Sequence, residues 1–281
     1  MISKEILVFD NKKTILDKID PQTKSQTSIE LIMRSFEYFI EKPNSGRDYE
    51  NRSFAKDVYN ELGWFNENYD VINSFWEIFS RAMHVVNPKD YPIKPAGNVG
   101  IYKKHNDFYN CKSFPEKFNA SDKTAKADVA RMLQVFPQFE EFASITHSVS
   151  NFTACPDFRF NSVKGVDSEV ADFLPLTVDK IQQCIDKGID YKYTANYTEK
   201  IVDTETLEYW HRWLLNNCVK FCLEDFYFCE GERLIPNYMF SGQSLTNPTP
   251  NTVDSVQECL NNMIARLERR AVKLCELSIT P

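Results

Sequence analysis

The sequence predicts a mainly α-helical fold, a compact multi-helix globular unit with a few short β-strands, and three observations support this class. Apolar residues recur at intervals of three and four along several segments, which is the spacing of one helix face. The 281 residues are 42% hydrophobic and 26% charged, as in ordinary globular proteins. Only 8 of them are glycine, which argues against folds that need many tight turns or glycine-rich phosphate loops.

Three helices are predicted in the first half of the chain. Residues 27–41 carry an apolar stripe that stops before Pro43, and residues 68–86 repeat the pattern up to Pro88. Residues 123–136 show the same spacing and form the third predicted helix.

Three more helices are predicted in the second half. Residues 174–187 have helical spacing and end at Gly188, which suits a helix stop because glycine adopts positive φ at low cost. The strongly aromatic segment 204–228 predicts another helix. Asn251 is a suitable cap for the last helix, over residues 253–274, whose apolar seam is the most regular in the chain.

Two domain organisations are compatible with this pattern. There is no internal repeat, low-complexity tract or linker rich in glycine and serine, which favours a single domain over residues 1–281. The alternative is a helical amino-terminal part, residues 1–118, followed by a helical carboxyl-terminal part, residues 119–281. Short strands are expected near residues 5–9, 99–102 and 145–153.

The charge of the chain disfavours non-specific binding to nucleic acid. The net charge is -7 and the pI is about 5.3, so most of the surface repels polyanions. A local basic patch would still allow such binding. We interpret the basic run near the carboxyl end as the solvated face of a helix; it consists of Arg266, Arg269, Arg270 and Lys273.

The sequence predicts a cytoplasmic protein without membrane association. No run of 18 apolar residues occurs, and the start of the chain lacks the apolar stretch and cleavage site of a secretory signal. In that compartment the 8 cysteines are expected to be reduced thiols.

The sequence leaves the cofactor unknown. The glycine-rich motifs of dinucleotide sites and P-loops are absent, as are paired C-x-x-C zinc knuckles. The nearest approach to a metal cluster falls on one helix face and is better explained by packing than by metal binding; it consists of His211, Cys218, Cys222 and Cys229.

The middle segment, residues 144–165, is the strongest candidate for function. It is rich in serine, threonine, asparagine and aromatic residues and has no clear periodicity, and such irregular segments often carry binding or catalytic residues. Hydrogen-bonding side chains surround His147 in this segment. The other histidines, at positions 84, 105 and 211, are interpreted as structural or simply exposed.

The run THSVSNFTACPDFRFNSVKG, followed by DFLPLTVDKIQQCI and then YWHRWLLNNCVKFCLEDFY, resembles the carboxyl half of an uncharacterised bacterial protein family. The resemblance covers about residues 144–230 and implies no known activity. The matching positions are Thr146, Asn151, Phe152, Pro156, Asn161, Lys164, Gly165, Asp172, Phe173, Leu176, Thr177 and Ile181.

SNFTACP, with Asn161 after it, is also faintly similar to the His-metal finger nuclease domain of modification-dependent restriction enzymes. This resemblance implies a metal-dependent nuclease with His147, Asn151 and Asn161 as catalytic residues and a divalent cation as cofactor. The chain departs from the pattern because no Asp-His pair is present: Met83 precedes His84, and Lys104 precedes the histidine at 105. The departure puts the activation of water in doubt.

The residues themselves suggest two roles in the middle of the chain. The amides of Asn151 and Asn161 can bridge backbone donors and acceptors and so pin an irregular loop. Lys164 suits an anionic ligand, whereas Asp167 and Asp172 suit a divalent cation, although acidic residues are also common ahead of a helix.

We therefore predict a soluble bacterial protein that binds a partner protein or a small ligand through the middle segment. The alternative hypothesis is a divergent metal-dependent nuclease or phosphodiesterase, with phage defence as a biological setting. A purely structural or inhibitory partner in such a system is a third hypothesis.

Overall fold

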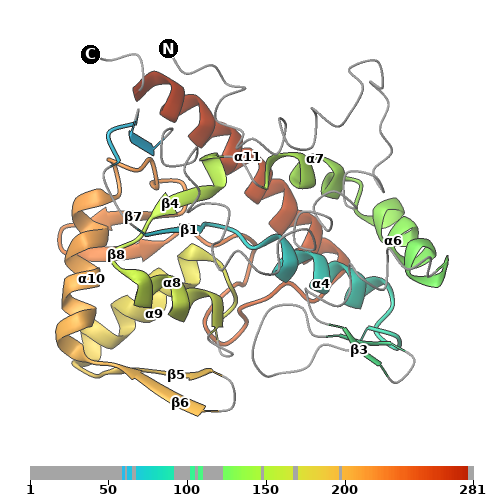
Figure 1. Cartoon of the computed structure of the whole chain (residues 1–281), viewed down its shortest axis with the longest axis horizontal. Helices are drawn as coiled ribbons and strands as arrows, with labels where there is room; N and C mark the ends of the chain where they lie inside the picture. Colours follow the sequence, from blue (N-terminus) through green and yellow to red (C-terminus); the bar gives the residue numbers. More distant parts are fainter. Residues whose placement is uncertain are drawn as a thin grey trace.

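The computed structural model describes residues 59–60, 62–64, 68–91, 102–104, 107–109, 123–146, 149–166, 170–195 and 198–277. This part of the chain is mainly α-helical with short strands, which confirms the predicted fold class (Figure 1). The predicted helix at 27–41 and strand at 5–9 lie outside the described residues. The helices are α4 (Phe75–Val86), α6 (Lys123–Val135), α7 (Gln138–Ile145), the 3₁₀ helix η2 (Val149–Asn151), α8 (Phe158–Val166), α9 (Leu174–Lys187), α10 (Thr204–Asn217) and α11 (Val253–Leu277).

The strands pair into small antiparallel sheets of two strands each: β1 (Tyr69–Val71) with β4 (Phe152–Ala154), β2 (Tyr102–Lys104) with β3 (Asp107–Tyr109), β5 (Tyr191–Ala195) with β6 (Thr198–Val202), and β7 (Tyr227–Glu230) with β8 (Arg233–Pro236). The strand expected near 145–153 overlaps β4 only at residues 152 and 153, because Ile145 ends α7 and residues 149–151 form η2. The strand expected at 99–102 overlaps β2 only at Tyr102. The β5–β6 hairpin projects from the helices at the lower edge of Figure 1.

The long helix α11 organises the core. It packs against α4, α7 and η2, and so joins the carboxyl end of the chain to elements far away in the sequence (Figure 1). Most of its predicted apolar seam is buried, through Val256, Leu260, Met263, Leu267 and Leu274, but Val253, the first residue of the seam, is 41% exposed. Its cap is Thr252 rather than Asn251, because Oγ1 of Thr252 accepts the N–H of Ser255 at 3.2 Å.

The predicted helix over residues 68–86 is wrong in its first part. Residues 69–71 form strand β1, in which Tyr69 pairs with Ala154 and Val71 pairs with Phe152. The helix begins at Phe75, after Ser74, whose hydroxyl accepts the N–H of Glu77 at 3.3 Å. Pairing with a distant strand overrides the helical spacing here, because the ladder supplies backbone hydrogen bonds that a helix would otherwise provide.

The predicted helix over residues 204–228 is too long. Helix α10 ends at Asn217, and the chain turns through Cys222, which has a φ of 53°, before entering β7. Both Nε and Nη2 of Arg270 donate to the carbonyl of Phe221, at 3.0 and 2.9 Å. The turn is therefore held by α11, which no local pattern in residues 204–228 reveals. By contrast, α9 has the predicted bounds and ends at Gly188 with a φ of 61°.

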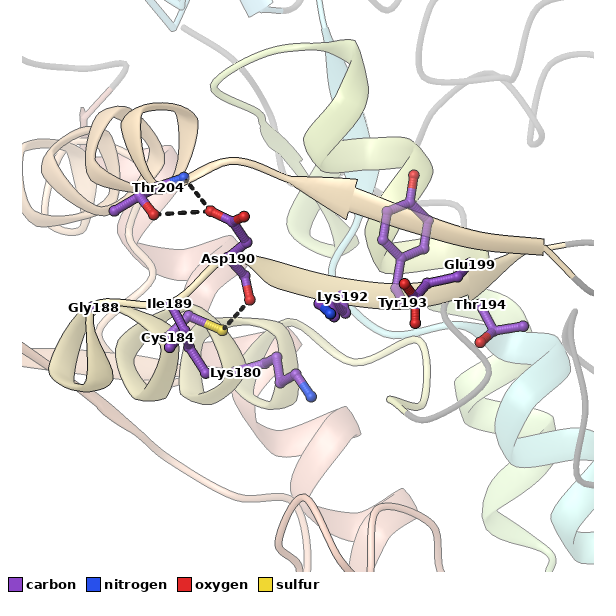
Figure 2. Close-up of a pocket in the computed structure, with 10 residues that line it drawn as sticks. All are labelled: Lys180, Cys184, Gly188, Ile189, Asp190, Lys192, Tyr193, Thr194, Glu199 and Thr204. Carbon is purple, nitrogen blue, oxygen red and sulfur yellow. Dashed lines mark hydrogen bonds between the residues drawn. The ribbon is translucent and has the colours of Figure 1, made fainter.

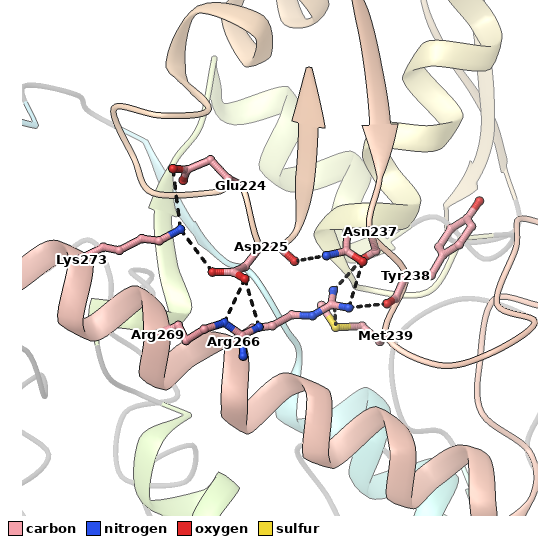
Figure 3. A network of polar contacts seen from close by, with 8 residues as sticks. All are labelled: Glu224, Asp225, Asn237, Tyr238, Met239, Arg266, Arg269 and Lys273. Atoms are coloured by element: carbon pink, nitrogen blue, oxygen red, sulfur yellow. Dashed lines mark hydrogen bonds and ion pairs between the residues drawn. The ribbon is translucent and has the colours of Figure 1, made fainter. Parts of the chain in front are cut away.

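The basic residues of α11 are not simply a solvated helix face, as the sequence suggested. Arg266 is only 6% exposed and donates to the carbonyls of Asn237 and Tyr238, each at 2.6 Å (Figure 3). Next to it, Arg269 and Lys273 form ion pairs with Asp225 at 3.0 and 3.4 Å. These contacts fasten the two ends of the β7–β8 hairpin to the last helix.

Candidate functional site

The middle segment is mostly buried rather than looped at the surface. Asn151, at the end of η2, is fully buried, and its amide is saturated by main-chain atoms. Oδ1 accepts the N–H of Asn73 at 3.1 Å, while Nδ2 donates to the carbonyls of Asn73 at 3.0 Å and Thr146 at 2.8 Å. This geometry supports the pinning role that the sequence suggested for Asn151.

Asn161 also bonds to the main chain, at the first residue of β1. It lies on α8, and its Nδ2 donates to the carbonyl of Tyr69 at 2.9 Å. The two asparagines therefore brace opposite ends of the same short stretch, residues 69–73. Two other predicted site residues, His147 and Asp167, lie outside the described residues.

Lys164 and Asp172 meet in a buried ion cluster, which we call the acid–lysine centre and which also includes Asp70. Nζ of Lys164 bonds to Oδ1 of Asp172 and lies 3.3 Å from Oδ2 of Asp70. The lysine is 2% exposed and each aspartate 8% exposed. The centre joins three separate elements, because Asp70 belongs to β1, Lys164 to α8, and Asp172 to the segment that leads into α9.

The charges of this centre do not balance, since one ammonium group faces two carboxylates. Burial raises the pKa of Asp70 to about 7; Lys164 opposes this shift and Asp172 adds to it. Burial alone would lower the pKa of Lys164, but the two carboxylates outweigh it and raise that pKa above its ordinary value. Lys164 is thus held as a cation, and Asp70 is the group that exchanges a proton near neutral pH.

A second buried cation, Arg270, holds residues 150–152 of the middle segment. Nη1 of Arg270, on α11, donates to the carbonyls of Ser150 at 2.7 Å and Phe152 at 2.8 Å. Its guanidinium also lies over the ring of Trp64, 5.5 Å from the centroid. Together with the acid–lysine centre, these contacts fix the middle segment at both ends of its described part.

One part of the middle segment is strongly exposed, the first turn of α8. Phe158 is 68% exposed, whereas Phe160, two residues later, is buried against Trp210 in an edge-to-face contact at 5.3 Å. Tyr209 of α10 is 44% exposed, and its hydroxyl donates to the carbonyl of Pro156 at 2.9 Å. We call Phe158, Arg159 and Tyr209 the α8 tip surface.

The α8 tip is also rigidly built. Oδ1 of Asp157 accepts the N–H groups of Arg159 at 2.8 Å and Phe160 at 2.9 Å, which caps the start of the helix. Oδ2 of the same carboxylate forms an ion pair with Nη2 of Arg159 at 3.2 Å. The direction in which Phe158 projects is therefore set by the backbone of this turn.

A hollow of about 660 Å³ lies between α9, the start of α10 and the β5–β6 hairpin (Figure 2). Oδ1 of Asp190 accepts both the N–H and the hydroxyl of Thr204, at 3.0 and 2.9 Å. The Cys184 thiol contacts the carbonyl of Asp190 at 3.9 Å. Burial raises the pKa of this thiol. The lining residues are Lys180, Cys184, Gly188, Ile189, Asp190, Lys192, Tyr193, Thr194, Glu199 and Thr204.

His211 takes part in a polar network rather than joining the cysteines. The Oε1 atom of Gln182 accepts the N–H of Leu234 at 2.8 Å and lies 3.0 Å from Nε2 of His211. Nε2 is therefore the protonated ring nitrogen, and burial lowers the pKa of the imidazole. Within the described ranges, no three His, Cys, Asp or Glu side chains lie close enough together to hold a metal ion.

Comparisons with known proteins give no further assignment. No protein-family model matches the chain, and no curated protein or solved structure is significantly similar to it. Among the helices that the structure describes, none is both long and apolar enough to cross a membrane.

Sequence reasoning missed Asp70, Tyr209 and the hollow. Asp70 falls in the first turn of the predicted helix over residues 68–86, where an acidic residue is common, and only the β1–β4 pairing carries it to Lys164. Tyr209 fits the aromatic pattern of a buried helix, so its exposure is not readable from spacing. The hollow depends on how a hairpin packs on α9, for which no motif exists.

Proposed function

We propose that this protein is a binding protein that docks a partner protein through the α8 tip surface. This proposal narrows the predicted role of the middle segment to its exposed first helical turn. The observation that carries it is the 68% exposure of Phe158 in a segment that is otherwise mostly buried, since residues 150–156 before it and Phe160 after it are buried.

The composition of the surface supports a protein partner. Aromatic residues and arginine are enriched at protein interfaces, and the α8 tip surface combines Phe158, Arg159 and Tyr209. Single exposed apolar residues are common on any protein. Here the Tyr209 hydroxyl bonds to the carbonyl of Pro156, two residues before Phe158, so two exposed aromatic side chains and an arginine come from adjoining positions. The rigid turn adds to this, because a preorganised anchor loses little entropy on binding.

The bonding of the two asparagines favours a binding protein over a hydrolase. Both Asn151 and Asn161 spend their amides on main-chain atoms of residues 69–73 and 146. No contact among the described residues supports the nuclease hypothesis specifically. Membership of the uncharacterised bacterial family remains a proposal that rests on the sequence resemblance.

Affinity capture from the cells that produce the protein tests this function. We expect the tagged wild-type chain to enrich a defined protein that Phe158→Ser and Tyr209→Ser no longer retain. Phe228→Ser is the matched control, because Phe228 is a 40% exposed phenylalanine on β7, outside the surface. Equal enrichment by all four chains, or no specific enrichment by the wild type, would contradict the proposal; circular dichroism verifies that each variant is folded.

A further inference from the structure

The hollow beside the β5–β6 hairpin differs from the α8 tip surface in its chemistry. It is concave, and most of its lining residues are polar or charged, whereas the exposed residues of the tip are mainly aromatic. A volume of about 660 Å³ lies within the range of small-molecule sites. It is therefore considered as a second site, independent of the proposed partner docking.

The hollow is lined by groups of both charges. Lys180 and Lys192 supply ammonium groups, and Glu199 supplies a carboxylate (Figure 2). The carboxylate of Asp190 also borders the hollow, but its Oδ1 already accepts two hydrogen bonds from Thr204. A ligand with an anionic group near a lysine and a cationic group near Glu199 matches this lining, whereas a purely anionic or purely cationic ligand meets like charge.

The hairpin positions several of these groups on one face. Thr194 and Glu199 are direct partners in the β5–β6 register, so their side chains share a face with Lys192, two residues before Thr194. Within the described part of the chain, the side chains of Lys192, Thr194 and Glu199 form no hydrogen bond or ion pair with one another or with a neighbour. They can therefore turn to a ligand without breaking an internal contact.

The neutral lining adds hydrogen-bonding capacity. Thr194 supplies a hydroxyl group that can both donate and accept, and Gly188 and Ile189 border the hollow beside the end of α9. Free amino acids and short peptides carry an ammonium and a carboxylate, and the peptides also carry amide groups, within this size. We propose that the hollow binds a small zwitterion of this class, an amino acid or short peptide.

Isothermal titration calorimetry with trialanine, N-acetyl-trialanine and trialanine amide tests this site. The acetyl group removes the ammonium charge, and the amide removes the carboxylate charge. We expect trialanine to bind at millimolar concentration and each blocked peptide to bind about tenfold more weakly or worse, because a charge-assisted contact is lost. No binding of trialanine, or equal binding of all three peptides, would overturn the proposal.

Variants of two lining residues, with a lysine outside the hollow as control, locate the binding site. Lys192→Ala and Glu199→Gln should each weaken trialanine binding about tenfold. Lys200→Ala is the matched control and should leave the affinity unchanged, since Lys200 is exposed on the same hairpin but pairs with Tyr193 and does not line the hollow. All three residues are exposed, so the fold should persist; binding that survives Lys192→Ala and Glu199→Gln would move the site elsewhere.

Discussion

At the scale of single residues, several buried polar side chains of the described part of the chain connect segments that are far apart in the sequence. Asn151 links η2 to residue 73, and Arg270 links α11 to Ser150 and Phe221. A buried polar or charged group without a hydrogen-bond partner costs free energy. Each of these side chains therefore favours the one arrangement of elements that supplies its partners.

Replacing Asn151 should therefore affect stability more than any chemistry. Asn151→Ala removes three hydrogen bonds to main-chain atoms and leaves their partners buried, which should lower the free energy of unfolding by about 2–4 kcal/mol. Asn216→Ala, at an exposed position of α10, should change it by less than about 0.5 kcal/mol. Urea unfolding measures both; similar small effects would contradict the bracing role.

Asp70 should make stability depend on pH. Its pKa is raised to about 7 in the folded chain from 3.8, so between these values the folded state binds a proton that the unfolded state has released. The contribution of this carboxyl to the free energy of unfolding therefore falls as the pH rises through that window.

Asp70→Asn removes the titration while keeping the shape. We expect the variant to be more stable relative to the wild type at about pH 8 than at about pH 5, because the neutral amide replaces a carboxylate that is charged only at the higher pH. Urea unfolding at both pH values provides the comparison. A stability difference that does not change with pH would show that Asp70 keeps its charge throughout.

At the scale of elements, α11 is the main organiser. One face supplies the apolar seam of the core, and its arginines reach the loops around β7 and β8 and the front of the middle segment (Figure 3). The helix thus fixes elements that have no local stop signals of their own, such as the end of α10.

Two neighbouring arginines on α11 should differ sharply in how much each contributes to the free energy of unfolding. Arg270→Met leaves the carbonyls of Ser150, Phe152 and Phe221 buried without this donor and should cost about 3–5 kcal/mol of the free energy of unfolding. Arg269→Met loses an ion pair whose arginine side chain is 54% exposed and should cost about 0–1 kcal/mol. Equal effects in thermal or urea unfolding would contradict the role given to α11.

The sequence could predict elements whose signals lie within the segment itself, but not those that depend on contacts with distant parts of the chain. Helix α9 was predictable because its apolar spacing and its stop at Gly188 lie within the segment itself. Strand β1 was not, because its pairing partner Phe152–Ala154 lies far away in the chain. Lys164 and Asp172 were noticed as chemically suitable residues, but their meeting with Asp70 depends on that same long-range pairing.

At the scale of the whole molecule, the buried contacts that hold the middle segment in place also fix the position of its exposed part, the first turn of α8. The acid–lysine centre and Arg270 hold the segment from inside, and the capped first turn of α8 presents Phe158 outward. A partner would therefore meet a preformed surface, and binding should not require refolding of the segment.

Photo-crosslinking in the producing cell tests this account most directly. A photoreactive phenylalanine analogue at position 158 should give one discrete crosslinked product with a second protein, whereas the same analogue at position 228 should give none. Both phenylalanines are exposed, Phe158 by 68% and Phe228 by 40%, so both can meet chance neighbours, and a discrete product at position 158 alone reports specific docking. No product at position 158, or the same products at both positions, would contradict the claim that the α8 tip surface binds a partner.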